Sequence, residues 1–160
     1  MNLERLEMMR VMMERVVAGS WEPDQSIMAE INRPRTTPLQ VNRVNLHSWR
    51  NPTDERNVCG YSACAVGHAC FDAEFRKMGM KWNGAAPLFK HDGGWDAVKS
   101  FFEIDKRLAE MLFSSAKYGH RVRNRYNHLS MHIREAKMVA DRIQELLDHG
   151  KQFIMDTHGY

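Results

Sequence analysis

All three cysteines of the chain lie in one short run of small residues, together with a histidine. The run reads Cys-Gly-Tyr-Ser-Ala-Cys-Ala-Val-Gly-His-Ala-Cys over residues 59–70. Sulfur and imidazole nitrogen are the ligands of structural zinc, so the candidate metal ligands are Cys59, Cys64, His68 and Cys70. On an unbroken helix, however, Cys70 lies on roughly the opposite side from His68, and the short Cys-x2-Cys pairs of zinc sites are absent. We therefore favour no metal ion here.

The same residues could carry nucleophilic catalysis. A helix dipole stabilises a thiolate at the helix N-terminus and so lowers the pKa of that cysteine. The spacing Cys-Gly-x-x-x-Cys-Ala loosely resembles the nucleophile turn of papain-like proteases, but it lacks their tighter spacing and the aromatic residue after the cysteine. A hydrolase or transferase that uses Cys59 or Cys64 needs a histidine base. The candidate bases are His68 in the same run and His120 or His128 further along.

Packing is the interpretation of this run that we favour. A free cysteine is among the most buried residue types and behaves as a small hydrophobic residue. Small residues recur at steps of three and four, which predicts one helix over residues 59–78 with a face of small side chains. Such a face lets a neighbouring backbone approach closely. His68 then lies at the edge of the core.

A basic segment follows in the last third of the chain. Between Lys117 and Arg134 there are five lysines and arginines and no aspartate or glutamate. The formal net charge of the whole chain is +3, so the rest of the chain carries −2. Arginines interleaved with histidines and tyrosines suit phosphate, through bidentate hydrogen bonds and ring stacking. The predicted ligand-binding residues are Arg121, Arg123, Arg125, Tyr126 and His128.

Several partners remain open for the basic segment. It suits an anionic small molecule, such as a nucleotide-derived one, or an acidic protein. A protein that only binds such a partner needs neither a cofactor nor a catalytic residue. Nucleic acid is a further alternative, although a pI near 8.8 is mild for that class. The remaining alternative is that the segment binds no ligand and is a solvent-exposed face or loop, as most runs of charged residues are. In a helix, Val122, Tyr126 and Leu129 would point inward, and Arg121 and Arg125 would share the outward face.

Amphipathic helices must position these segments. Apolar residues recur at steps of three and four in residues 3–17 and 95–104, in a stretch after Asp105, and in residues 131–149. Asn2 and Asp105 are the expected N-caps, and Gly19 and Gly150 the expected ends. Within residues 23–50, Leu39 and Val41 alternate with polar neighbours, and Val44 and Leu46 do so again one residue out of phase. This pattern predicts two short strands or one bulged strand, and Trp49 is expected to anchor the strands to the core. Residues 79–94 are expected to be a loop, and their glycine-rich part, residues 84–94, matches no phosphate-cradling motif.

These elements predict a mainly α (α+β) fold, a compact helical domain of five to six helices with a small two- or three-stranded β element. Residues 1–150 form a single domain and residues 151–160 a C-terminal tail. With 43% hydrophobic and 27% charged residues, the chain is neither wholly disordered nor a coiled-coil rod. It has no apolar run long enough to cross a bilayer and no signal-peptide core, so we expect no membrane partner and a cytoplasmic location.

Methionines cluster in the first predicted helix. Four of the twelve methionines are Met8, Met9, Met12 and Met13. Methionine-rich faces are adaptable contact surfaces, so one expectation is a homo-oligomer that forms through this helix. Simple packing of the methionines in the core of one chain is the alternative.

Two motifs together resemble a group of small phage and bacterial proteins. Asn45-Leu46-His47-Ser48-Trp49 precedes a Cys-Gly-x-x-Ala-Cys-x-x-Gly run, and Gly94-Trp95-Asp96-Ala97 resembles a downstream helix of the same group. The likeness covers most of residues 40–148, with Tyr61 where the group has threonine. The group has no assigned activity, so the resemblance implies no catalytic residue. It implies a small phage-encoded protein in the host cytoplasm, for which we expect a counter-defence role: sequestering a host signal or inhibiting a host protein.

Overall fold

The computed structural model describes residues 1–26, 41–44, 50–51, 61–83 and 86–158. Helices dominate these residues and the strands are short, which confirms the predicted mainly α (α+β) fold. The helices are α1 (Leu3–Val17), α3 (Ala65–Phe71), α4 (Ala73–Lys77), α5 (Trp95–Phe102), α6 (Lys106–Phe113), the short 3-10 helix η2 (Ser115–Lys117), α7 (His120–Arg125) and α8 (Met131–His158). The strands are β1 (Val41–Val44), β2 (Arg50–Asn51), β3 (Tyr61–Ala63), β4 (Met80–Trp82), β5 (Pro87–Phe89) and β6 (Asp92–Gly93).

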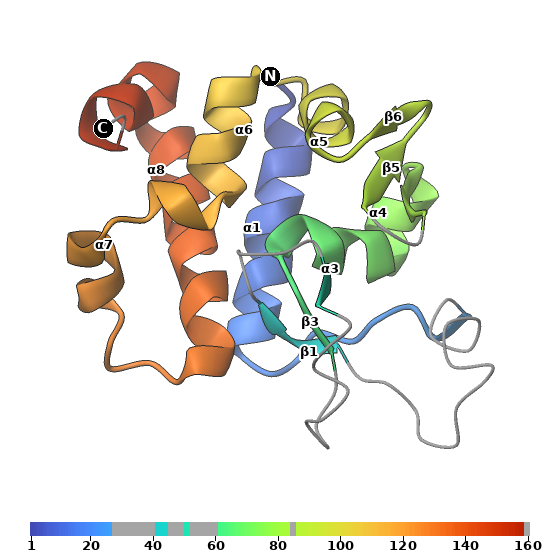
Figure 1. Ribbon diagram of the computed structural model, residues 1–160, viewed down its shortest axis with the longest axis horizontal. Coiled ribbons are helices and arrows are strands. Elements are labelled where there is room, and N and C mark those ends of the chain that lie inside the picture. Colours follow the sequence, from blue (N-terminus) through green and yellow to red (C-terminus); the bar gives the residue numbers. More distant parts are fainter. Residues whose placement is uncertain (27–40, 45–49, 52–60, 84–85, 159–160) are drawn as a thin grey trace.

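Helices α1 and α8 form the centre of the molecule. Figure 1 shows them side by side, with α6 and α7 next to α8 and with α3, α4 and the β5–β6 hairpin on the other side of α1. Helix α1 begins as predicted, because the Asn2 side chain accepts a hydrogen bond from the backbone nitrogen of Arg5 at 3.1 Å. It ends just before Gly19, whose φ of +70° is the left-handed conformation typical of helix ends.

The methionine-rich face of α1 lies inside the protein. Met9, Met12 and Met13 are at most 2% exposed, and Met8 packs half-buried against the same core. The face contacts α8, α5 and α3. Core packing is therefore confirmed for these methionines, and the predicted homo-oligomer loses the surface on which it depended.

Helix α8 carries the predicted apolar stripe. Ala136, Ala140 and Ile143 on this stripe are fully buried. The helix is interrupted at Gly150, as predicted, because the φ of +81° and ψ of 173° at that residue are not helical. The first part of α8 therefore ends where the sequence indicated.

The residues after Gly150 differ from the predicted tail. Residues 151–158 continue as helix, and Ile154 is fully buried. The imidazole Nε2 of His158 lies 2.6 Å from the Glu145 carboxylate, and Lys151 pairs with Asp105 at the start of α6. One buried isoleucine in a short segment produces no visible apolar repeat, so the sequence did not indicate this helix. Ile154 nevertheless packs the segment onto the rest of the domain.

The predicted single helix over residues 59–78 is wrong. Its described part consists of strand β3 followed by the short helices α3 and α4. The Cys64 sulfur accepts a hydrogen bond from the backbone nitrogen of Gly67 at 3.2 Å and caps α3. Asp72 has an extended backbone and caps α4 through the backbone nitrogens of its first residues. Both side chains compete with the continuation of a helix, and this competition divides the run.

The first sheet agrees in part with the predicted β element. Strand β1 lies within residues 23–50 and β2 begins at Arg50, but the central strand β3 comes from the run predicted to be helical. Strand β1 pairs in parallel with β3, with a register irregularity between Val41 and Arg43, and β2 pairs antiparallel with β3. Helices α8 and α3 pack on β1 and provide the cover that a small sheet needs. The predicted anchor Trp49 lies outside the described residues.

The predicted loop over residues 79–94 contains a second sheet instead. Strands β4, β5 and β6 pair antiparallel, and each is only two or three residues long, too short for alternation to be visible in the sequence. Phe89 of this sheet meets Phe101 of α5 edge-on with ring centres 5.0 Å apart. Phe101 also packs on Phe75 and Phe102, so an aromatic cluster joins the sheet to the helices.

Candidate functional site

A pocket of about 490 Å³ opens where the second sheet meets the start of α1 and the end of α5. Three basic side chains line it: Arg5 of α1, Lys81 of β4 and Lys90 of the turn between β5 and β6. Glu103 is the single acidic side chain among the described residues that line it. Met78, Leu88 and Phe89 provide apolar wall. The pocket therefore combines an excess of positive charge with an apolar surface.

Arg5 is held in place at this pocket. Its Nη1 donates a hydrogen bond to the backbone oxygen of Phe101 at 2.6 Å. The guanidinium carbon lies 4.6 Å from the centre of the Phe101 ring and 5.6 Å from that of Phe89, which are cation–π distances. A guanidinium has five N–H donors. Since the polar contacts of Arg5 within the described chain involve Nη1, its Nε and Nη2 groups can donate to a ligand.

Backbone strain is concentrated at the same pocket. Lys90 (φ +55°) and Glu103 (φ +53°) are the only non-glycine residues with a left-handed backbone in the described ranges, and both line the pocket. Lys90 lies in a two-residue hairpin turn and Glu103 directly follows α5, two positions where glycine or asparagine is usual. Strain of this kind clusters at ligand sites. It marks the pocket independently of its charge.

Replacing Glu103 by glycine should raise the free energy of unfolding by roughly 0.5–1 kcal/mol, because glycine adopts the left-handed conformation without a Cβ clash. The contacts that are lost are weak: Glu103 accepts from Asn2 at 3.2 Å and lies 4.0 Å from Arg5, with more than half of its side chain exposed. Urea denaturation measures the change. The matched control is Glu110→Gly inside α6, which should destabilise the protein by about 1 kcal/mol. A loss of stability in the Glu103 variant would contradict the strain assignment.

The two described cysteines are buried thiols. Cys64 is 2% exposed and Cys70 is fully buried. Loss of hydration raises the pKa of Cys64 to about 12 and also raises the pKa of Cys70 well above the usual thiol range. At Cys64, burial outweighs the hydrogen bond from Gly67 at the helix start, which by itself lowers the pKa. Both thiols are therefore neutral at pH 7, in keeping with a packing role, and Cys59 lies outside the described residues.

His68 is fully buried beside these cysteines. Its Nδ1 lies 3.0 Å from the backbone oxygen of Cys64, and because a carbonyl only accepts, Nδ1 carries the proton. Its ring contacts Trp21 with centres 4.8 Å apart. A base that activates the Cys64 thiol would bond to its sulfur. Nδ1 of His68 bonds to the main-chain oxygen of Cys64 instead. Among the described residues, no three His, Cys, Asp or Glu side chains converge as a metal site would require.

Arg123, one of the predicted ligand-binding residues, supports the fold. Its Nε donates to the backbone oxygen of Tyr118 at 2.8 Å and its Nη2 to that of Ser115 at 3.1 Å. Its Nη1 lies 3.8 Å from the Glu135 carboxylate. The guanidinium therefore connects α7 to the turn before it and to α8, and these contacts occupy most of its donors.

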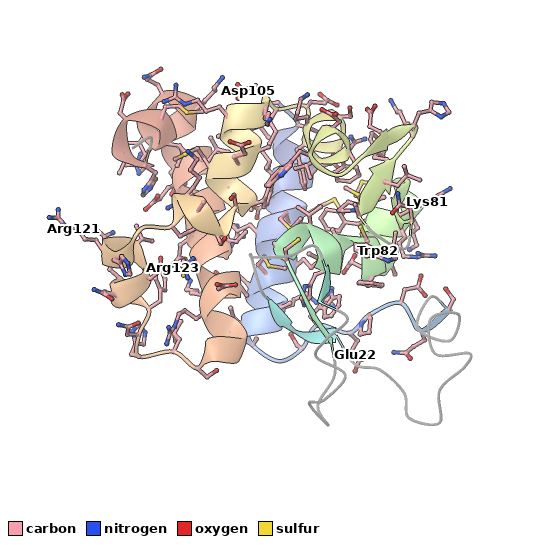
Figure 2. All side chains as sticks on the ribbon, viewed as in Figure 1. Glu22, Lys81, Trp82, Asp105, Arg121 and Arg123 are labelled. Carbon is pink, nitrogen blue, oxygen red and sulfur yellow. The ribbon has the colours of Figure 1, made fainter. Side chains whose placement is uncertain are left out.

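Of the other predicted residues of the basic segment, Tyr126 supports the fold as Arg123 does, and the remaining three are exposed. The Tyr126 hydroxyl donates to the Asp141 carboxylate at 2.8 Å, and burial raises the pKa of Tyr126. Arg121, Arg125 and His128 are exposed, which confirms the outward face that a helix predicted for the two arginines. Figure 2 shows Arg121 pointing away from the body of the protein, on the opposite side from Lys81. The exposed arginines and the pocket are thus separate features.

The sequence does not predict the pocket, because its lining residues come from four separate stretches of the chain and form no motif. The one signal that touched them was the glycine-rich run 84–94, which contains the lining residues Leu88, Phe89 and Lys90. No helix in the described ranges has the length and apolar character needed to cross a membrane. Comparisons of the chain with models of protein families, with curated proteins and with solved structures gave no match.

Proposed function

We propose that this protein binds a small phosphate-bearing molecule in the pocket lined by Arg5, Lys81 and Lys90. The observation that carries the proposal is the imbalance of charge, three basic side chains against Glu103 alone among the described lining residues. A space of about 490 Å³ suits a ligand of nucleotide size. The two strained backbone positions at its edge are a second, independent support.

Each group in the pocket has a distinct part in this binding. Arg5 is pre-positioned by Phe101 and can present paired N–H groups to phosphate oxygens, the strongest geometry for such contacts. Lys81 and Lys90 are exposed at the edge and add point charges on flexible stems. Met78 and Leu88 offer an apolar surface for a ring or an aliphatic part of the ligand. The ligand is therefore expected to carry a phosphate and an apolar portion.

Binding of this kind requires no catalytic residue. For a phage-encoded protein, the origin that the sequence resemblance implies, we propose that this binding serves counter-defence. In that role the protein would sequester a nucleotide-derived signal of the host in the cytoplasm and thereby lower its free concentration. We expect the protein to bind the ligand and to release it chemically unchanged.

Replacing Arg5 by glutamine should weaken phosphate-ligand binding by about 10- to 100-fold, because a hydrogen bond between charged groups contributes roughly 1.5–3 kcal/mol. Isothermal titration calorimetry with pyrophosphate and with a nucleoside monophosphate measures the change. Lys81→Gln and Lys90→Gln should each have a smaller effect, about threefold, since both lysines are exposed. The matched control is Lys106→Gln, an exposed lysine on α6 outside the pocket, which should bind like the parent protein.

Two results would overturn this proposal. One is that the unmodified protein takes up neither probe at millimolar concentration. The other is that the Arg5 variant, shown to be folded by circular dichroism, binds both probes as tightly as the Lys106 control.

A further inference from the structure

A second basic feature lies on α7, apart from the pocket. The exposed side chains of α7 and of the turn after it, which we call the α7 ridge, are His120, Arg121, Asn124, Arg125, Asn127 and His128. The side chains of Arg121 and Arg125 make no hydrogen bond or ion pair with any residue that the structure describes. They lie one helical turn apart, with Cβ atoms about 5–6 Å from each other. Both can therefore reach the same partner.

The ridge is held on a rigid support. Arg123, between the two exposed arginines, bonds to the backbone at Tyr118 and Ser115. Tyr126 anchors the end of the helix to Asp141 of α8. A helix of six residues is marginal by itself, so these contacts are what keep α7 formed. A partner would meet arginines whose backbone is already ordered.

The charge around the ridge is positive and largely uncompensated. No aspartate or glutamate occurs between Glu110 and Glu135 in the sequence. Glu135 itself pairs with Arg123, and Asp141 accepts from Tyr126 and from Lys137. The two acidic side chains that contact this segment are thus engaged, and the outward face of α7 attracts anions.

The composition of the ridge favours a nucleic acid over an acidic protein. Stable protein interfaces need an apolar centre, but none of the exposed large hydrophobic side chains, Met1, Leu3, Val11 and Phe153, lies on this segment. Arginine, asparagine and backbone N–H groups are the usual partners of the phosphate backbone. A single strand would also need a ring for base stacking. Tyr118 is buried, and Tyr126 is half-buried with its hydroxyl bonded to Asp141. The exposed rings of the ridge are therefore the imidazoles of His120 and His128, which are smaller stacking surfaces than tyrosine.

We propose that the α7 ridge binds the phosphate backbone of a nucleic-acid duplex without sequence preference, through Arg121 and Arg125. This activity is separate from ligand binding in the pocket, because the two features lie on opposite sides of the molecule (Figure 2). With two principal phosphate contacts the binding is weak and depends strongly on salt. It would localise the protein on duplexes while the pocket remains free.

The test is fluorescence anisotropy of a labelled 20-base-pair DNA duplex with the full chain, between 50 and 200 mM KCl. The double variant Arg121→Gln/Arg125→Gln should bind the duplex at least about tenfold more weakly at 50 mM KCl. The slope of the logarithm of the association constant against the logarithm of the KCl concentration should fall in magnitude by about 1.8, which is about 0.9 for each lost phosphate contact. The matched control is Arg107→Gln, an exposed arginine of α6 that is not part of the ridge, and it should keep the parent slope. Arg5→Gln should also leave duplex binding unchanged, whatever its effect in the pocket.

Several outcomes would overturn the proposal. The first is no duplex binding at 50 mM KCl, and the second is a double variant, folded by circular dichroism, with the affinity and slope of the parent. Tighter binding of the single strand of the same sequence would contradict recognition of a duplex. Arginine-dependent binding of polyglutamate without binding of the duplex would assign the ridge to an acidic protein instead.

Discussion

Replacing Arg142 by alanine lowers the free energy of unfolding by about 3 kcal/mol in our expectation, because two hydrogen bonds from a charged donor are lost and a cavity remains. Arg142 is only 2% exposed. Its Nη1 donates to the backbone oxygens of Met111 at 2.7 Å and Lys117 at 3.1 Å. Its guanidinium carbon lies 3.7 Å from the centre of the Tyr118 ring, which adds a cation–π contact.

The position of Arg142 explains this large effect. The last carbonyls of a helix lack partners within that helix, and a positive charge near them is stabilising. Met111 lies in the last turn of α6, and Lys117 ends η2. One side chain of α8 thus satisfies the ends of two preceding elements. Without it, the buried oxygen of Met111 loses this charged donor.

Urea denaturation of Arg142→Ala, Arg142→Met and Arg107→Ala measures this effect and separates its causes. Methionine fills much of the same space but cannot donate, so if the hydrogen bonds dominate, Arg142→Met should lose nearly as much stability as the alanine variant. The exposed Arg107 should change stability by less than about 0.5 kcal/mol. A loss below about 1 kcal/mol for Arg142→Ala would show that these contacts contribute little.

Replacing Phe101 by alanine should cost about 3–5 kcal/mol, the usual range for removing a buried phenylalanine. Phe101 is fully buried and packs on Phe75, Phe89 and Phe102 with ring centres 5.0–5.7 Å apart. It also carries the ring and the backbone oxygen that hold Arg5. The effect is therefore expected on the pocket as well as on the core.

A milder variant keeps this prediction testable if the alanine protein does not fold. Phe101→Leu retains much of the volume and the backbone oxygen but removes the ring under Arg5. It should lose less stability than the alanine variant and bind pyrophosphate a few times more weakly. The matched control is Phe153→Ala, since Phe153 is 37% exposed and should change stability by less than about 1 kcal/mol. Equal stability of the Phe101→Ala and Phe153→Ala proteins would contradict the role of the aromatic cluster.

The long helices could be predicted from local pattern alone. Helices α1 and α8 repeat their apolar residues over several turns, so the periodicity is clear. Their boundaries were also readable, because Asn2, Gly150 and the α6 cap Asp105 act on backbone groups within a few residues of themselves. Short elements were predicted less well. The helix expected over residues 59–78 is divided by Cys64 and Asp72, whose side chains bond to nearby backbone nitrogens in a way that periodicity does not reveal.

By itself, the sequence determined the helical class, the ends of the main helices and the inward side of α7, since these depend on neighbours along the chain. Only the tertiary structure decided which basic side chains share a pocket. Lys81 and Lys90 come together because β4 pairs with β5, and Arg5 joins them because it packs on Phe101, whose ring meets Phe89 of β5. The tertiary structure also separated Arg123, which bonds to backbone oxygens, from the exposed Arg121 two residues earlier. Both are arginines in one basic run, and the surroundings that each side chain meets in the folded chain give them different roles.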